Sequence, residues 1–508
     1  MKKTSRKKKT LYSIVFLGMY QIIVFICNLI VPKLILAKYG SEYNGICSSI
    51  TQFLNLVAIL RIGVAGATRV ELYKAFVYKD SDKVNRIVKA TDIFMRKISI
   101  IFLILLLLFA VVYPIVLDTQ YSFINVSSLV LIIGLGTFSQ YFFGLTYQTL
   151  LQADQKLYIY NIIQIIANLL NALCVCLLIK YNYSIHMVKL ISIIIFSLSP
   201  IVLNLLISYI YKINKNVEPD NTALEKKNDV VAHSIANIIH ENTDVVVLTL
   251  FTSVKIVSVY TVYYFVSNGI KQIFEIFTSS MESIFGDLWV KQEMKQFEDG
   301  LKLFEFIIGV LVSIVFSCAI ILIIPFVKLY TSGVTDINYI LPLYAILVLI
   351  AQMFYCFRIP YVTIVQAAGK YKETKTGAYL EAAINIVISC VFCKIIGIYG
   401  VVIGTLCANV FRTIQYEFFS SKYLLRKKNY NSLFNIVWSI FNIFVCFLGY
   451  KFFEYSFLIN INSWFLWITV AFIVFIFALI ETIISSLIFY PKNVINIFKI
   501  IKKKNNVI

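Results

Sequence analysis

The sequence predicts an all-α polytopic membrane protein with about 14 transmembrane helices. Three observations predict this class. Hydrophobic residues fill 60% of the 508 positions and charged residues only 14%, against roughly 25% charged residues in soluble domains. The apolar residues gather in long stretches that are separated by short polar connections. Lysine and arginine collect in every second connection, as they do in the cytoplasmic loops of membrane proteins.

The long apolar stretches set the limits of each expected helix. A hydropathy window of about 19 residues matches the thickness of a bilayer. It places the spans at 11–36, 43–65, 97–117, 126–150, 157–179, 187–211, 230–253, 256–282, 302–324, 340–363, 376–397, 399–420, 433–454 and 463–489.

The basic residues predict the orientation of these spans. Most of the 46 lysines and arginines lie in the N-terminal segment, in the connections after even-numbered spans and in the C-terminal tail. The positive-inside rule therefore predicts that both termini are cytoplasmic. This distribution also accounts for the formal net charge of +20, so we expect no nucleic-acid partner.

Two connections are longer than the others. The connection 66–96 is expected to form an amphipathic helix on the membrane, with Val84, Ile87 and Val88 on its apolar face. The connection 212–229 is a polar, charged linker between spans 6 and 7. On either side of this linker and after the second lobe we therefore expect three parts: an N-terminal six-helix lobe at 1–211, a C-terminal six-helix lobe at 230–424, and two additional helices with a basic tail at 425–508.

Spans 7 and 8 carry charges in their interiors. On a helix that turns 100° per residue, His240 and Asp244 share one stripe of span 7. Lys271 and Glu275 share one stripe of span 8 in the same way. A charge at the bilayer centre costs roughly 2.5–3.5 kcal/mol, so such stripes face protein or water and indicate a hydrated cavity. His240 and Asp244 are candidates for ion coupling through a proton relay, or each is hydrogen-bonded to a neighbouring helix.

Four basic residues, Arg61, Lys271, Arg358 and Arg412, lie within or near span interiors. A cavity that gathers several cations suits an anionic head group such as a diphosphate, so these four are candidate substrate-binding residues. For Arg61 and Arg412 the alternative is that the side chain extends to the membrane interface.

Polar residues on the same spans complete the candidate substrate site. Asn161 and Gln164 belong to a ladder of amides on span 5. Such amides contact a sugar, or they fasten helices to one another at around 0.6 kcal/mol per bond. Glu275 on span 8 is a candidate contact for a sugar or for a coupling ion.

The sequence predicts no metal, no cofactor and no catalytic residue. Cys390 and Cys393 lie inside an apolar span, where helix packing explains them, and 3 histidines are too few for a histidine-rich metal site. Asp80 and Asp82 have the carboxylate spacing of a glycosyltransferase metal site, but in a lysine-rich connection they suit a solvated helix start. No extramembrane region is long enough for a catalytic domain, so we do not expect an enzyme.

Four segments resemble a known family. The stretch GVAGATRVELYK at 63–74 resembles the glycine-rich end of the second helix in bacterial polysaccharide-export flippases of the O-antigen and capsule type. NTDV at 242–245, VSVY at 257–260 and FGD at 285–287 are similar to their seventh and eighth helices. These flippases belong to the multidrug/oligosaccharidyl-lipid/polysaccharide exporter superfamily. Arg61 departs from the family pattern, because many relatives carry an acidic residue there, and its role stays open.

The resemblance implies two six-helix lobes around a central cationic lumen, followed by two extra C-terminal helices. It also implies a flippase that translocates undecaprenyl-diphosphate-linked oligosaccharide repeat units across the bacterial cytoplasmic membrane by alternating access, for surface polysaccharide assembly. The expected partners are this lipid-linked oligosaccharide, membrane lipids, a polysaccharide polymerase and a coupling Na⁺ or H⁺.

Two alternatives to this flippase remain open. A membrane-embedded glycosyltransferase or polymerase on the same lipid carrier is disfavoured, because such polymerases tend to have a large outer loop and the outer connections here are short. A multidrug exporter of the same superfamily needs an anionic cavity for cationic drugs, whereas basic residues are prominent in these spans.

Overall fold

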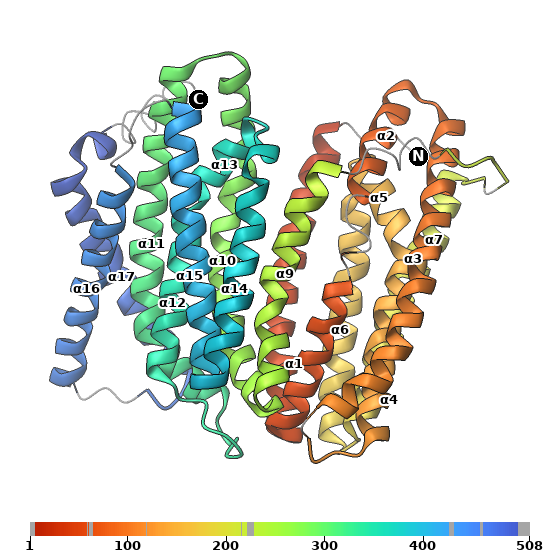
Figure 1. Cartoon of the computed structure of the whole chain (residues 1–508), viewed down its shortest axis with the longest axis horizontal. Helices are drawn as coiled ribbons and strands as arrows, with labels where there is room; N and C mark the ends of the chain where they lie inside the picture. The colour runs from red at the N-terminus through yellow and green to blue at the C-terminus, as the bar shows by residue number, and fades with distance from the viewer. Residues whose placement is uncertain are drawn as a thin grey trace. The chain divides into compact units, whose positions relative to one another are not determined.

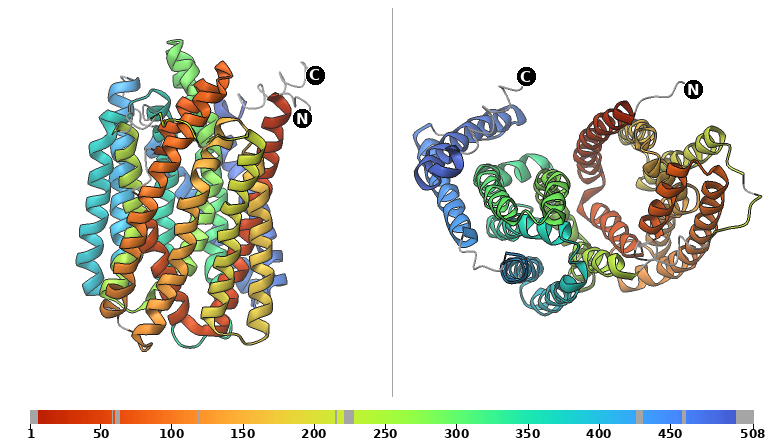
Figure 2. Two further views of the ribbon diagram at one scale, coloured as in Figure 1. Left: turned by 90° about the vertical axis from the view of Figure 1, so that its right-hand side faces the viewer. Right: turned by 90° about the horizontal axis from the view of Figure 1, so that it is seen from above.

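The computed structural model of the chain describes residues 6–57, 59, 64–117, 119–214, 216–220, 228–425, 431–457 and 461–495. Every regular element in these residues is a helix (Figure 1). The helices form two compact units, Met1–Ser258 with Gly333–Ile337, and Val259–Ser332 with Asn338–Ile508. Within each unit the long helices run side by side, as the view from above in Figure 2 shows. The chain is an all-α polytopic membrane protein.

The first unit is built around two apolar cores. Its elements are α1 (Arg6–Val57), α2 (Val64–Tyr78), α3 (Ser81–Val116), α4 (Phe123–Ser139), the π-helical turn η2 (Gln140–Gly144), α5 (Leu145–Ala153), α6 (Leu157–Lys180), α7 (Ile185–Tyr211), α9 (Asn228–Phe251) and the start of α10 (Val254–Val290). One core joins α1, α3 and α4, and includes Ile50, Phe102 and Leu129, which are fully buried.

The second unit contains the rest of α10 and the helices that follow it. These are α11 (Met294–Tyr330), α12 (Pro342–Phe357), α13 (Ile359–Ala367), α14 (Tyr371–Ile396), α15 (Ile398–Phe419), the π-helical turn η3 (Ser420–Leu425), α16 (Asn431–Phe457) and α17 (Trp464–Phe489).

Eleven helices in the described part of the chain are long and apolar enough to cross a membrane. This is fewer than the predicted number of spans for two reasons. First, α1 runs through the first predicted span and most of the second, with only a kink between them at Gly40. Second, α9 and α10 do not qualify by composition, because the polar residues of predicted spans 7 and 8 lower their mean hydropathy.

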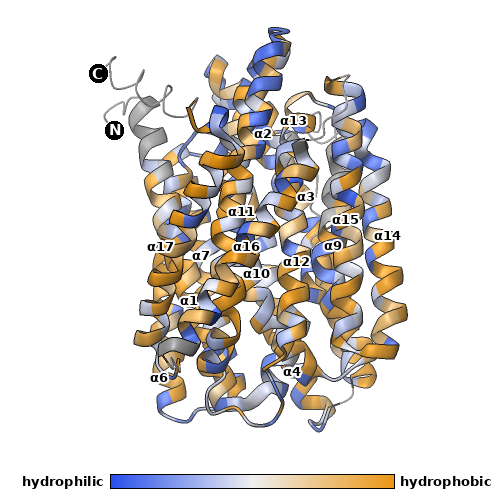
Figure 3. Ribbon diagram, turned by 90° about the vertical axis from the view of Figure 1, so that its left-hand side faces the viewer, coloured by the Kyte–Doolittle hydropathy of each residue, from blue (hydrophilic) through white to orange (hydrophobic). Residues whose placement is uncertain are grey.

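The outward faces of these helices are apolar. Leucine, isoleucine and phenylalanine side chains are exposed along α14, α16 and α17, with Val387 and Phe472 each more than half exposed. Figure 3 shows the hydrophobic residues running over most of the length of these helices. Because lipid tails solvate such side chains and water does not, this surface agrees with a multi-pass membrane protein.

The prediction for the connection 66–96 is wrong. Val84, Ile87 and Val88 lie in the second core of the first unit, where they are buried with Leu72 and Tyr147. Their apolar face therefore packs on α2 and α5 and does not lie on the membrane surface. The helix pattern itself was correct, but an amphipathic face does not specify whether protein or lipid covers it.

The start of α3 agrees with the solvated helix start predicted for Asp80 and Asp82. Asp80 caps the helix, and its Oδ1 accepts a hydrogen bond of 2.9 Å from the Lys83 N–H. Both aspartates are exposed, and Asp82 lies in the first turn, where a negative charge is favourable.

α1 is interrupted at Gly40, which has φ 82° and ψ 177°, a conformation that glycine adopts more readily than other residues. The helix resumes at Ser41, whose N–H and hydroxyl donate to the two carboxylate oxygens of Asp336 at 2.8 and 2.6 Å. Asp336 thus acts as a cap for the second half of α1. For this reason the segment Gly333–Ile337 packs with the first unit, although it lies between α11 and α12 in the sequence.

In the second unit, α14 and α15 approach closely through glycines. A Cβ atom added at Gly400 would lie 2.2 Å from the backbone carbon of Phe392, and one at Gly404 would lie 2.1 Å from Ser389 Oγ. The spacing of four residues places both glycines on one face of α15. This is the small-residue packing that brings helices together in membranes, where apolar side chains alone give no driving force.

Polar contacts fasten α16 and α17 to the same unit. Asn442 on α16 donates to Ser313 Oγ on α11 at 3.2 Å and accepts from the Ser485 hydroxyl on α17 at 2.8 Å. The Trp438 indole N–H donates to Ser485 Oγ at 2.7 Å. Because these atoms are buried in an apolar setting, the network fixes which faces of the three helices meet.

Candidate functional site: a buried arginine pair in the second unit

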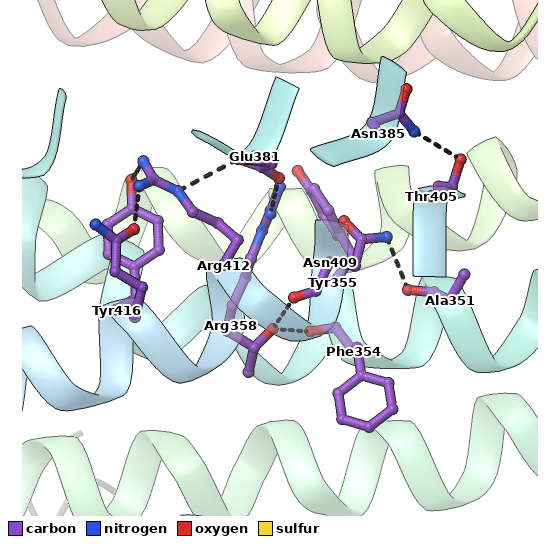
Figure 4. Close-up of polar contacts among 12 residues, drawn as sticks. Ala351, Phe354, Tyr355, Arg358, Glu381, Asn385, Thr405, Asn409, Arg412 and Tyr416 are labelled. Atoms are coloured by element: carbon purple, nitrogen blue, oxygen red, sulfur yellow. Dashed lines mark hydrogen bonds and ion pairs between the residues drawn. The ribbon is translucent and has the colours of Figure 1, made fainter. Parts of the chain in front are cut away.

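Two arginines of the second unit share one carboxylate. Arg358 Nη1 lies 2.5 Å from Glu381 Oε1, and Arg412 Nε lies 3.3 Å from Glu381 Oε2 (Figure 4). The exposed fractions of Arg358, Glu381 and Arg412 are 7%, 8% and 2%. Arg412 therefore does not extend to the membrane interface, and that alternative for it is wrong. Arg358 and Arg412 are 54 residues apart in the sequence, and they reach the same carboxylate because α15 packs on both α12 and α14.

A break between two helices positions Arg358. The residue lies between the end of α12 and the start of α13, and Pro360 lies in the first turn of α13. Proline has no N–H and its ring displaces the preceding turn, so the helix cannot continue regularly through this point. Side chains of α15 bond carbonyls of α12 at the break: Asn409 Nδ2 donates to Ala351 O at 2.9 Å, and the Thr413 hydroxyl donates to Phe354 O at 2.9 Å. The backbone at Arg358 stays right-handed helical, and the Val362 N–H donates to Arg358 O at 3.0 Å, so α12 and α13 form one kinked span.

Aromatic rings extend the arginine pair towards the surface of the unit. The Arg412 guanidinium carbon lies 4.1 Å from the ring centroid of Tyr416, and that of Arg358 lies 4.3 Å from the ring centroid of Tyr355. Lys271 Nζ on α10 lies 4.9 Å from the same Tyr355 ring. The negative face of an aromatic ring attracts cations, so Tyr355 joins Lys271 to the arginine pair.

Lys271 and Glu275 form the outer end of this array. Their Nζ and Oε1 atoms lie 3.6 Å apart, and the side chains are 17% and 46% exposed. The Tyr355 hydroxyl donates to Glu275 Oε1 at 2.7 Å. We call Lys271, Glu275, Tyr355, Arg358, Glu381, Arg412 and Tyr416 the cationic array. Its three cations exceed its two carboxylates by one positive charge, so the array attracts anions inside a membrane-spanning unit.

Removing the Lys271–Glu275 pair tests whether the charge of Lys271 serves binding or stability. A half-exposed pair contributes about 0–1 kcal/mol to folding, so Lys271→Ala and the double change Lys271→Ala with Glu275→Ala should both reach the membrane in normal amount. Transport should fall about tenfold in both variants, because one cation near a phosphate is worth about 1.4 kcal/mol or more. Lys271→Arg should retain most of the activity. Transport rates in reconstituted vesicles, normalised to protein amount, provide the measurement.

Restored transport in the double variant would contradict this expectation. It would mean that Lys271 serves only to neutralise Glu275. The arginine pair would then have to hold the anion without help from α10.

The other predicted site residues lie in the first unit or outside the described residues. Arg61 is outside the described part of the chain. Gln164 on α6 donates to Ser199 Oγ on α7 at 3.0 Å, so it fastens two helices as the structural alternative proposes, and Asn161 is 2% exposed. His240 and Asp244 lie one turn apart on α9, half-buried and buried. The structure thus brings together four of the predicted residues, namely Lys271, Glu275, Arg358 and Arg412.

Sequence reasoning missed the residues that complete the array. Glu381 lies in the interior of the predicted span 376–397, so the rule that singled out the other charged residues applied to it as well. Tyr355 and Tyr416 lie three residues before Arg358 and four residues after Arg412. An aromatic residue one turn from an arginine is a signal for a cation–π contact on the same helix face.

The second unit also contains a small acidic pocket. Glu305 and Glu417 line it, together with Tyr361 and Ser432. The Tyr361 hydroxyl donates to Glu305 Oε1 at 2.6 Å, and the Ser432 hydroxyl donates to Glu417 Oε1. Two carboxylates repel an anion, so the cationic array is the better candidate for an anionic head group.

One protein-family model matches part of the chain. The family model described as the C-terminal domain of protein CPR-5 matches residues 211–370. No curated protein sequence matches the chain.

Three solved structures share the fold. The lipid II flippase MurJ in an inward closed conformation has a TM-score of 0.69 and 16% identity, over 95% of this chain and 100% of the flippase. An inward-facing multidrug resistance MATE family transporter of the MOP superfamily has a TM-score of 0.62 and 14% identity, over 81% of this chain and 97% of the transporter. The Vibrio cholerae MATE transporter VcmN in its bent form has a TM-score of 0.53 and 12% identity, over 82% of this chain and 95% of the transporter. The chain therefore shares the fold of these two transporters and of the lipid II flippase.

Proposed function

We propose that this chain is a flippase that moves undecaprenyl-diphosphate-linked oligosaccharide repeat units across the bacterial cytoplasmic membrane by alternating access. The observation that carries the proposal is the cationic array, in which buried Arg358 and Arg412 and the more accessible Lys271 exceed their carboxylate partners by one charge. A diphosphate needs several positive donors at short range.

The fold supports movement of a lipid rather than a reaction on one. The similar solved structures are transporters, and one of them is a lipid II flippase. A multidrug exporter with the same fold is less favoured, because a cationic drug would meet the excess positive charge of the array. The enzymatic alternative loses its best motif, since Asp80 caps α3 and Asp82 is an exposed residue of its first turn.

The remaining parts of the proposal follow from the sequence. The two termini are cytoplasmic, the lobes correspond to 1–211 and 230–424, and a polysaccharide polymerase uses the exported units. His240 with Asp244 couples transport to Na⁺ or H⁺, whereas Gln164 bonds Ser199 and Asn161 is buried, so both amides hold helices together in this proposal.

Reconstitution tests the flippase proposal directly. The purified chain is placed in vesicles that contain a fluorescent undecaprenyl-diphosphate oligosaccharide, and a membrane-impermeant quencher is added outside. We expect the quencher to reach the label of both leaflets in vesicles with the protein, and only that of the outer leaflet in vesicles without it. The labelled lipid should remain chemically unchanged, and thin-layer chromatography of the extracted lipid checks this.

A matched control separates this result from the enzymatic alternative. The double change Asp80→Asn with Asp82→Asn should leave the transport rate unchanged, because neither residue contacts the array. A lengthened or shortened oligosaccharide would favour an enzyme. Transport of a fluorescent organic cation in place of the labelled lipid would favour a drug exporter.

A further inference from the structure

Glu381 lies between two guanidinium groups and pairs with one nitrogen of each. Each of its carboxylate oxygens faces a different guanidinium, that of Arg358 on one side and that of Arg412 on the other. Guanidinium groups pair with carboxylates and phosphates through the same N–H groups and the same geometry. A phosphate that binds between the two arginines, at the nitrogens that face Glu381, therefore competes with Glu381.

Three of the other four N–H groups of Arg412 are already engaged by the protein. Its Nη1 donates to Thr374 O at 3.1 Å and to the side-chain oxygen of Gln415, and its Nη2 donates to the Tyr416 hydroxyl at 2.7 Å. A guanidinium has five N–H groups in all. These contacts account for three of the five, which leaves the second Nη2–H and Nε–H. Nε lies 3.3 Å from Glu381 Oε2, so it is the nitrogen that an exchange with Glu381 involves.

We propose that Glu381 is a resident anion that the substrate diphosphate displaces from Arg358 and Arg412, and that the released carboxylate takes up a proton from the aqueous side. This inference rests on the proposed function, since the displacing group is the diphosphate of that substrate. In the exchange, two ion pairs to Glu381 are lost and two to phosphate oxygens form. The proton comes from water and leaves again when Glu381 re-forms its pairs. One proton thus accompanies each bound diphosphate.

Electrostatics favours the proton step. Without it, a carboxylate and a diphosphate would lie side by side in a buried site where charges interact strongly. The charged and titratable groups around Glu381 come from three helices and the break between two of them. These groups are Arg358 at the α12–α13 break, Arg412 and Tyr416 on α15, Tyr355 on α12, and beyond that ring Lys271 and Glu275 on α10. Three cations remain to hold the diphosphate once Glu381 is neutral.

The sign of the pH effect follows from this exchange. Protonated Glu381 does not compete for the arginines, so a lower pH should strengthen diphosphate binding. Where binding requires one added proton, the affinity changes by up to about tenfold per pH unit. A glutamine at position 381 imitates the protonated acid and should remove this dependence.

Binding of farnesyl diphosphate to the full chain in lipid nanodiscs tests the proposal. The dissociation constant is measured from pH 8.5 to 5.5 for the natural chain and for Glu381→Gln. We expect the natural chain to bind more tightly as the pH falls. The variant should bind at pH 8.5 at least about tenfold more tightly than the natural chain, with little change below that pH. Farnesyl diphosphate itself titrates in this pH range, but this affects both proteins equally. The effect therefore cancels in the ratio of their dissociation constants.

Thermal unfolding keeps the test informative if the variant is unstable. Glu381→Gln leaves two buried guanidinium groups without their carboxylate, so we expect a lower melting temperature without ligand. Farnesyl diphosphate should raise the melting temperature of the variant more than that of the natural chain, because the phosphates replace the lost anion. Glu305→Gln is the matched control: Glu305 is buried in the same unit at 4% exposure but is not in the array, so its affinity and pH dependence should not change.

Three results would overturn the inference. The first is that Glu381→Gln binds no more tightly at pH 8.5 than the natural chain, and the second is that it keeps the pH dependence of the natural chain. If binding still depends on Arg412, either result leaves the proposed function intact. No binding of the diphosphate by either protein at any pH overturns the proposed function together with the inference.

Discussion

Replacing Arg358 with glutamine is expected to abolish transport, with a fall of about 100-fold or more in rate, while the protein still folds. Loss of a buried charge-assisted contact to phosphate removes about 2.7 kcal/mol, which corresponds to this factor. Folding survives because Glu381 keeps its pair with Arg412, so no buried charge is left alone. The measurement is the transport rate in reconstituted vesicles, set against the melting temperature of the same preparation.

A change of equal charge elsewhere separates the local effect from the overall charge. Lys291 is an exposed cation just after α10, and it pairs with Asp287 at 2.7 Å. Lys291→Gln should leave the transport rate within about twofold of the natural chain, because an exposed pair contributes about 0–1 kcal/mol. Equal losses in the two variants, or normal transport in Arg358→Gln, would exclude the arginine pair as the head-group site.

The double change Gly400→Ala with Gly404→Ala is expected to separate α14 from α15 and to prevent accumulation of folded protein. Each new Cβ would lie within 2.2 Å of an atom of α14, and at Gly400 that atom belongs to the backbone and cannot rotate away. Overpacking of this kind destabilises by about 1–3 kcal/mol per site. Yield and monodispersity after size-exclusion chromatography provide the measurement, and transport should fall with them because Glu381 and Arg412 lie on the two separated helices.

Gly18→Ala is the matched control for this substitution. Gly18 lies in α1, and no atom comes within 4 Å of a Cβ added there. Alanine is favoured over glycine inside a helix by about 1 kcal/mol, so this variant should be at least as stable as the natural chain. A folded double alanine variant with normal stability would show that α15 can move away from α14 without penalty.

The sequence predicted correctly those features that depend on the residues of a single helix. Periodicity placed Lys271 and Glu275 on one face, and the structure has them 3.6 Å apart. Charge in an apolar span singled out Arg358 and Arg412, which are both buried. The same local reasoning recognised the exposed helix start at Asp80, because an N-cap depends only on the next few residues.

Contacts between different helices could not be predicted from the sequence. No single-span pattern shows that Arg358 and Arg412 meet at one carboxylate, since the three residues come from different helices. The kink at Arg358 was missed because Pro360 lies near the end of a mostly apolar stretch that was read as one regular helix. Val84 was assigned to the membrane surface because lipid and protein interior both select apolar side chains.

The capping of Ser41 by Asp336 has a consequence for modularity. The polypeptide passes from one unit to the other after Ser258, after Ser332 and after Ile337, although the polar linker suggests a single crossing at 212–229. A fragment that ended in this linker would lack α9 and the carboxylate that caps the second half of α1. The N-terminal half therefore cannot be exchanged for that of a relative on its own. A chimaeric protein would have to take residues 333–337 from the same parent as the N-terminal half.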